Sequence, residues 1–283
     1  MNRRKIEERI VKALAAGSTL VIFSSLILLL VTIVMKGLSS FSLAMITQSP
    51  KGGYYIGKEG GILNAILGSL YLAGGATLLA LLLSLPIVFY LNVYARKRSR
   101  LVIFTRFSLD VLWGVPSIVY GAFGFTLMLI FGLKASLLGG IIAVALLILP
   151  IMSRAMDEVV RMVPHELFEA SYALGATKLE TAFKVIVRQA LPGILTAILI
   201  AFGRGIGDAA SVMFTAGFTD SIPTSLLRPA ATLPLAIFYQ LGTPFPEVQG
   251  RAYASAFVLT LIILIISVVA RILARGFTKH IVK

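Results

Sequence analysis

The chain has 283 residues, of which 58% are hydrophobic and 13% are charged, and its formal net charge is +14. Soluble domains are nearer half apolar and a quarter charged, so this composition predicts an integral membrane protein built of helical spans. The apolar runs are continuous rather than alternating, which argues against a membrane β-barrel. Cysteine is absent, which excludes disulfides, a thiol nucleophile and a cysteine-ligated metal.

Six apolar stretches are predicted to cross the membrane, so the expected fold class is an all-α integral membrane protein with about six transmembrane helices. The first stretch is too long for the core of a signal peptide, and we expect it to remain as an anchor. The six stretches cover about Ala13–Met35, Ile62–Tyr90, Leu101–Phe131, Ser136–Met152, Pro192–Thr215 and Ala252–Leu273.

The 26 Lys and Arg residues mostly flank these stretches, which explains the basic charge better than nucleic-acid binding does. Six spans put both termini on one side of the membrane, and 19 of the Lys and Arg residues lie on that side against 6 on the other. Since positively charged loops stay inside, both termini are expected in the cytoplasm.

The polar loop between the fourth and fifth stretches, Pro164–Gly193, is predicted to form two helices joined by a tight turn. Pro164 suits the first turn of a helix, Gly175 suits the left-handed conformation that ends one, and Thr177 with Glu180 matches a capping box. A helix-turn-helix in this cytoplasmic loop would offer a surface that another protein can grip. An ordinary amphipathic loop helix is the alternative; DNA binding is disfavoured because the membrane holds both ends.

A charged pair is predicted inside the fifth stretch. Arg204 lies 12 residues past Pro192, about 18 Å along a helix, which is near the middle of a hydrocarbon core of about 30 Å. A charge at that depth marks a transport pathway or an ion pair, and Asp208 at i+4 can pair with Arg204 on one helix face. Gly205 and Gly207 thin the helix and favour a pathway, whereas a purely structural ion pair is the alternative.

The third stretch is predicted to break near its middle. Pro116 removes a backbone donor and Gly114 relaxes the chain, so a broken or kinked helix is expected before Ser117. Broken membrane helices expose amides that can hold an anion, although a simple proline kink is equally consistent. Asp110, just before the break, could pair with a neighbouring cation.

Gly52–Lys58 matches the phosphate-binding loop of nucleotide hydrolases, but we reject this interpretation. Glu59 stands where a Ser or Thr must reach magnesium, and the segment is expected outside the cell, away from ATP. The chain is therefore expected to carry no ATPase of its own.

Together these segments resemble the PstA-type membrane subunits of phosphate-specific ABC importers. Glu169, Ala170 and Ser171 followed by Gly175 are similar to the EAA loop of ABC importer permeases. The other matching stretches are Gly60–Leu72, Gly114–Gly124, Leu191–Leu199 and Arg204–Gly217, and the segment that starts at Leu233 is similar as well. The resemblance divides the chain into residues 1–60, with the tail, first anchor and external loop, and a core permease domain at 61–283 with its coupling loop at about 164–192.

The resemblance implies a type I, MetI-like permease that moves inorganic phosphate into the cytoplasm from the inner membrane. Its implied partners are a PstC-type second permease, a PstB-type ATPase dimer, a PstS-type external phosphate-binding protein and membrane lipid, with no nucleic acid. ATP would be used by the ATPase partner, and this chain would bind no cofactor and no metal. The implied ATPase-coupling residues are Glu169, Ala170 and Gly175, and the implied pathway residues are Arg204, Asp208, Gly205, Gly207, Pro116 and Ser117.

Two alternatives remain open at this point. A permease for another oxyanion, such as phosphonate, sulfate or molybdate, would share the fold and the loop. An intramembrane enzyme is disfavoured, because Arg204 and Asp208 come without a His, Cys or metal set. The resembling family usually has Glu where Asp208 stands, which bears on substrate preference.

Overall fold

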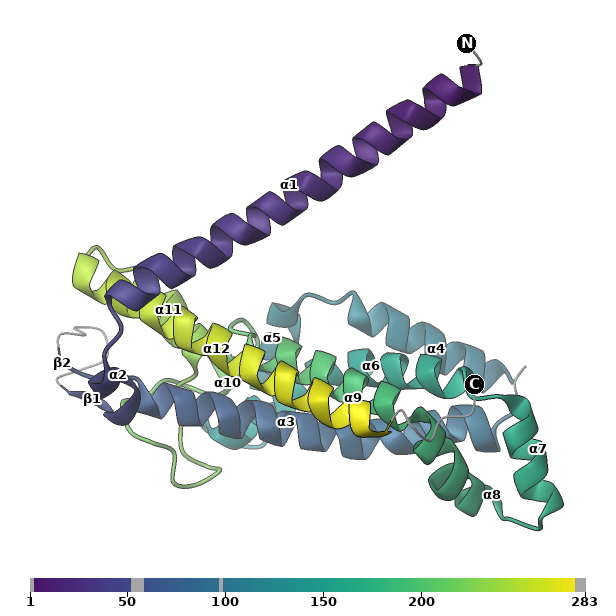
Figure 1. The fold of residues 1–283 in the computed structure, drawn as a ribbon. Helices are drawn as coiled ribbons and strands as arrows, with labels where there is room; N and C mark the ends of the chain where they lie inside the picture. The colour runs from purple at the N-terminus through teal and green to yellow at the C-terminus, as the bar shows by residue number, and fades with distance from the viewer. Residues whose placement is uncertain (1–2, 52–58, 97–98, 278–283) are drawn as a thin grey trace.

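The computed structural model describes residues 3–51, 59–96 and 99–277. Long helices run side by side through most of the molecule (Figure 1). Five of the described helical segments are long and apolar enough to cross a membrane, and a bent helix pair gives a sixth if it counts as one span. The long helices are α1 (Arg3–Ser39), α3 (Leu63–Phe89), α6 (Leu137–Arg161), α9 (Val187–Ile206) and α12 (Pro246–Phe277). The predicted all-α class is confirmed.

Short elements gather at the two ends of the bundle (Figure 1). One end, which we call the hairpin end, holds α2 (Leu43–Thr47), α11 (Leu233–Leu241) and two antiparallel strands, β1 (Pro50–Lys51) and β2 (Glu59–Gly60). The opposite end, which we call the loop end, holds α7 (His165–Ala173) and α8 (Lys178–Glu180). The rejected nucleotide-loop pattern at 52–58 lies outside the described residues.

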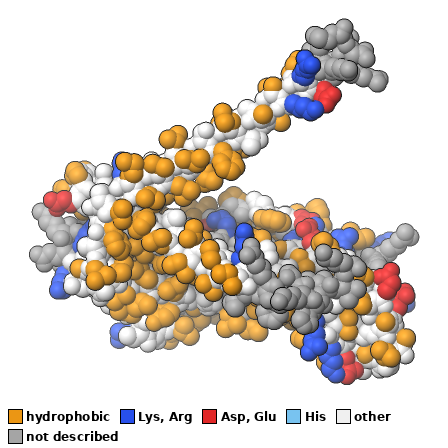
Figure 2. Space-filling view, in the orientation of Figure 1, with side chains coloured by type: hydrophobic (Ala, Val, Ile, Leu, Met, Phe, Trp, Pro, Cys, Tyr) orange, Lys and Arg blue, Asp and Glu red, His pale blue; other side chains and the backbone are white. Residues whose placement is uncertain are grey.

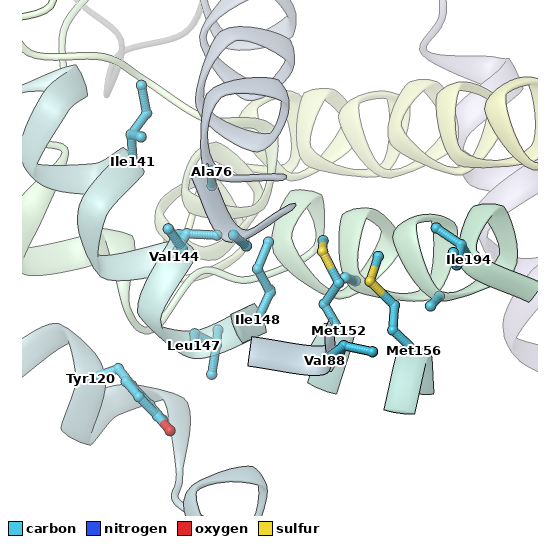
Figure 3. Packing of buried hydrophobic residues seen from close by; sticks show 14 of the residues in the cluster. Ala76, Val88, Tyr120, Ile141, Val144, Leu147, Ile148, Met152, Met156 and Ile194 are labelled. Atoms are coloured by element: carbon cyan, nitrogen blue, oxygen red, sulfur yellow. The ribbon is translucent and has the colours of Figure 1, made fainter. Parts of the chain in front are cut away.

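Helix α6 forms the centre of the core, with α3 and α9 packed against it. Its side chains Val144, Ile148 and Met152 belong to one buried apolar cluster with Val88 of α3 and Ile194 of α9 (Figure 3). Helices in a membrane associate through van der Waals packing and occasional hydrogen bonds rather than through the hydrophobic effect. The structure shows both, because Ser153 of α6 donates a hydrogen bond of 2.9 Å to Ser84 of α3 in this buried interface.

The third predicted span is broken as expected, into α4 (Arg100–Trp113) and α5 (Ser117–Ile130), with a bend of 102° between them. Helix α4 packs on the C-terminal half of α6, where Asp110 meets Arg154. Helix α5 packs on the N-terminal half of α6, where Gly124 lies against Ala143. The pair therefore follows α6 along both halves, which favours one broken span over a loop that re-enters on the same side.

Two π-helical segments lie towards the loop end. They are η1 (Tyr90–Tyr94), which continues α3, and η2 (Thr181–Ile186), which leads from α8 into α9. The rings of Phe89 and Phe183 meet edge to face there, with centroids 5.1 Å apart. Such π segments are rare and often occur at functional sites. The apolar sequence pattern gave no sign of them.

Helix α1 stands away from the bundle over most of its length, and its apolar side chains are exposed (Figures 1 and 2). None of the residues in the most apolar stretch of this helix is buried. Near its C-terminal end it meets α12, where Gly37 approaches Tyr253 and Phe257 and the rings of Phe41 and Phe257 lie 5.9 Å apart. A helix of this kind needs lipid or another protein around it.

Several helix ends lie away from the predicted limits of the spans, three of them with a physical reason or consequence. The fourth span was expected to end near Met152, but α6 continues to Arg161 because its later charged residues are paired. The last span was expected to begin near Ala252, but α12 begins at Pro246, which is favourable in a first helical turn. The fifth span was expected to reach Thr215, but α9 ends at Ile206.

Candidate functional site

The charged pair predicted in the fifth span is present, but its geometry differs from the prediction. Nη1 of Arg204 lies 3.3 Å from Oδ1 of Asp208. Helix α9 ends at Ile206 with Gly207 as its cap, so Asp208 lies in the turn beyond the helix and not on its face. The expectation of one continuous helix face was wrong because an Asp side chain that bonds the backbone three residues ahead favours a turn.

The carboxylate of Asp208 is buried, with its side chain 3% exposed. Its Oδ2 atom accepts hydrogen bonds from both the backbone N–H, at 2.8 Å, and the hydroxyl of Ser211. Ser211 starts the turn into the short helix α10 (Val212–Thr215). Both carboxylate oxygens are thus engaged, which is what a buried charge requires.

Arg204 is much more open than its partner, with 45% of its side chain exposed. A guanidinium carries five N–H donors in a planar fork, and Asp208 occupies only part of it. The neighbouring Gly205 packs against Val144 and Ile148, near the middle of α6. The structure therefore presents an accessible cation beside the middle of α6, which is the most buried of the long helices, and the carboxylate of Asp208 holds this cation in place.

The glycines around Arg204 have different roles. A Cβ atom on Gly205 would lie 3.1 Å from Cγ1 of Val144, so this glycine permits close packing of α9 on α6. Gly207 is exposed and forms the helix cap. A Cβ atom on Gly203 would meet nothing within 4 Å. Gly205 thus faces the protein, and Gly207 shares the open side with Arg204.

The break between α4 and α5 reaches the same place. Pro116 caps α5, which begins at Ser117, and Gly121 follows one turn later. A Cβ atom on Gly121 would lie 2.9 Å from Cα of Ser211 and from the carbonyl oxygen of Ala210, so only glycine fits. The first turns of α5 therefore press on the turn that holds Asp208. Two segments predicted separately from the sequence form one region.

The predicted coupling loop folds as expected. Gly175 has φ +81 and ends α7 with paired hydrogen bonds, from Ala176 N–H to the Ser171 carbonyl at 3.1 Å and from Gly175 N–H to the Tyr172 carbonyl at 2.9 Å. The capping box of Thr177 and Glu180 is present. The two parts of the loop are held together by a buried hydrogen bond of 2.8 Å between Ser171 and Thr181.

The outer surface of this loop is open. Glu169 and Ala170 are exposed, and Glu169 pairs with His165 of the same helix at 3.2 Å. Leu174, beside the glycine turn, is 89% exposed. Acidic, basic and hydrophobic side chains share this end of the molecule (Figure 2). Tyr172 and Leu179 of the same loop are exposed as well, and a group of exposed apolar side chains is typical of a surface that another protein covers.

A buried ion-pair network lies behind the loop, and the sequence analysis missed its centre. Asp157 is 0% exposed and accepts hydrogen bonds from Arg106 at 2.8 Å, Asn92 at 2.7 Å and Arg154 at 3.2 Å. Arg154 also pairs with Asp110 at 2.6 Å, which confirms that Asp110 has a cationic partner. The signal for Asp157 was its i+3 spacing from Arg154 at the end of an apolar helix.

Comparison with known proteins gives consistent relatives over most of the chain. A family model described as binding-protein-dependent transport system inner membrane component matches residues 89–283. The phosphate transport system permease protein PstA of Yersinia pestis is 36% identical over 270 residues, covering 95% of this chain and 90% of that protein. PstA 1 of Mycobacterium tuberculosis is 34% identical over 281 residues, covering 98% of this chain and 92% of that protein.

Two solved structures share the fold. An inward-facing structure of the MetNI methionine ABC transporter superposes with a TM-score of 0.64 at 20% identity, over 76% of this chain and 95% of that chain. An amino acid ABC transporter superposes with a TM-score of 0.53 at 18% identity, over 79% and 94%. At these identities the similarity concerns the fold, and it confirms the expected MetI-like architecture.

Proposed function

Since the chain belongs to the family of binding-protein-dependent transport system inner membrane components, we propose that it is the permease subunit of an ATP-driven importer that moves inorganic phosphate into the cytoplasm. Relatives named as phosphate transport permeases, 34–36% identical over at least 95% of the chain, support phosphate as the substrate. The family is one of transport components, which leaves the enzyme alternative without support.

The observation that carries the proposal is Arg204, an open guanidinium held from beneath by a buried carboxylate. The planar fork of a guanidinium suits the oxygens of a tetrahedral oxyanion. Asp208 fixes one edge of that fork and offsets part of its charge when no anion is bound. Gly207 caps the helix that carries Arg204, and Pro116 and Ser117 begin the helix whose Gly121 meets Ser211. We propose that these residues border the path that the anion follows.

We further propose that the loop end faces the cytoplasm, together with both termini. The ATPase would then bind the exposed face of Glu169, Ala170 and Leu174, and Gly175 would hold the turn that presents it. A related second permease would complete the pathway beside Arg204, and an external phosphate-binding protein would deliver the anion at the hairpin end. ATP acts in the ATPase partner, and this chain itself holds no cofactor.

Transport of the anion follows from a change in the contacts between the two permeases. Closure of the ATPase dimer on ATP would draw the two coupling loops together. Ser171 and Thr181 tie α7 to η2, so movement of the loop is passed to α9, which carries Arg204. The pathway then opens alternately to the two sides, as in other transporters with rigid moving halves.

The test is reconstitution of the chain with its second permease, its ATPase and its binding protein in proteoliposomes. We expect ATP hydrolysis to rise when the binding protein carries phosphate, and labelled phosphate to cross with it. The same binding protein presented with sulfate, molybdate or a phosphonate should give no stimulation. Stimulation by one of these anions instead of phosphate would show a permease of the same fold for another oxyanion.

A further inference from the structure

Ser211 occupies a junction that the sequence analysis did not single out. It is 0% exposed, and its N–H and hydroxyl both donate to Oδ2 of Asp208. Its carbonyl oxygen accepts a hydrogen bond of 2.9 Å from the hydroxyl of Thr215. Gly121 of α5 lies against its Cα atom. Ser211 thus joins α5, α10 and the carboxylate that holds Arg204.

Two donors on one oxygen fix the rotation of a carboxylate. With Oδ2 held by Ser211, Oδ1 of Asp208 is directed at Nη1 of Arg204, 3.3 Å away. Arg204 has a long side chain that is 45% exposed, and Asp208 is its ion-pair partner among the described residues. The direction of the guanidinium therefore depends on the direction of the carboxylate, and this depends on Ser211.

The turn itself has other supports. The N–H of Asp208 donates to the carbonyl of Gly205 at 3.3 Å, and the N–H of Met213 donates to the carbonyl of Ala209 at 3.1 Å. The backbone N–H of Ser211 remains as a donor to Asp208 whatever its side chain is. The hydroxyl is therefore an addition to a turn that is already held, and its removal frees the carboxylate more than it frees the backbone.

We propose that Ser211 is a positioning residue for transport: through Asp208 its hydroxyl sets the direction in which Arg204 meets the tetrahedral anion. The inference rests on the proposed function and assigns a specificity role to a residue that does not touch the anion. If the guanidinium of Arg204 turns away from the direction that Asp208 gives it, its charge still attracts anions. Its N–H donors then match the oxygens of the anion less well.

The experiment uses the whole reconstituted complex with Ser211→Ala. We expect phosphate uptake to fall about tenfold, since small displacements of a positioning group have large effects on rate. Uptake of arsenate, a tetrahedral anion with longer bonds, should fall by a different factor, so the phosphate-to-arsenate ratio changes. Assembly and thermal stability should match those of Ser153→Ala, which removes the buried bond to Ser84 elsewhere in the bundle.

The uptake measurements on Ser211→Ala either support or overturn the positioning role of Ser211. Uptake close to that of the unsubstituted complex, or uptake reduced with an unchanged ratio of the two anions, would overturn it in favour of a structural role. A second pair, Ser211→Thr and Ser211→Val, has matched shape and differs in the hydroxyl, and the Thr variant should transport faster. The proposed function fails separately, if the unsubstituted complex takes up no phosphate.

Discussion

Among single residues, Arg204 is the side chain on which the proposed transport depends most. Replacing it with Ala removes the fork that would meet the anion, and we expect phosphate uptake to fall to background. The Arg204→Lys variant keeps the charge but not the planar fork and should retain only part of the uptake. Copurification of the ATPase measures assembly, which should be unchanged in both. Normal uptake by Arg204→Ala would make the pair with Asp208 structural only.

Asp157 permits a test of stability at the same scale. Asp157→Ala leaves Arg106 and Arg154 without their shared buried partner, and breaking a buried pair costs about 3–5 kcal/mol. We expect a lower denaturant midpoint for the purified protein in detergent. Glu158→Gln is the matched control, because Glu158 is 63% exposed and 3.6 Å from Arg154, and exposed pairs contribute about 0–1 kcal/mol. Equal midpoints for the two variants would contradict the buried role of Asp157.

The sequence predicted the pairing of Arg204 with Asp208 better than it predicted the geometry of that pair. The i+4 spacing of Arg204 and Asp208 indicated their pairing, but the argument assumed a continuous helix. The competing bonds from Ser211 to Asp208 end that helix, and nothing in the apolar pattern signals them. Asp157 was missed because its partners Asn92 and Arg106 come from other elements.

At the scale of elements, the coupling loop depends on the left-handed turn at Gly175. A Cβ atom there would meet nothing within 4 Å, so the cost of substitution is conformational and not steric crowding. We expect Gly175→Val, which cannot hold φ +81 without strain, to abolish stimulation of ATP hydrolysis by the loaded binding protein. Gly175→Asn should keep most of it, because Asn accepts this conformation. Full stimulation in the Val variant would rule out a coupling role for the turn.

Elements with local signals were predictable, and elements that depend on packing were not. The cap at Thr177, the turn at Gly175 and the break at Pro116 follow from the chemistry of a few neighbouring residues. The π segments at Tyr90–Tyr94 and Thr181–Ile186 do not, because the contact of Phe89 with Phe183 joins residues far apart in the chain. The two π segments connect the coupling loop region to α3 and α9. A movement of the coupling loop would therefore reach these helices through the π segments.

For the whole molecule, the proposed orientation places the loop end in the cytoplasm and the hairpin end outside. The native chain has no cysteine, so a single introduced thiol reports its own side. In sealed right-side-out vesicles, an impermeant maleimide should label Lys51→Cys at the hairpin end and should not label Lys178→Cys at the loop end. Both lysines are exposed, so access through the membrane is what differs. Labelling of Lys178→Cys alone would reverse the proposed orientation.

Fold class at this scale followed from hydrophobic length alone, since five of the described helical segments and one bent pair have the predicted apolar character. The order in which they pack could not be predicted. The central place of α6 reflects its buried Val144, Ile148 and Met152, and an apolar run does not show which of its residues will face another helix. The apolar pattern also did not predict that α1 stands away from the bundle over most of its length.

The meeting of α1 with α12 has a consequence for how the protein is made. Helix α1 leaves the ribosome long before α12, and the two meet through Gly37 and Phe257. During synthesis α1 therefore enters the bilayer well before α12 exists, surrounded by acyl chains or by the insertion machinery. Joining the two helices is a late event in biogenesis, and a ribosome that stalls before residue 257 leaves α1 without its contact to α12.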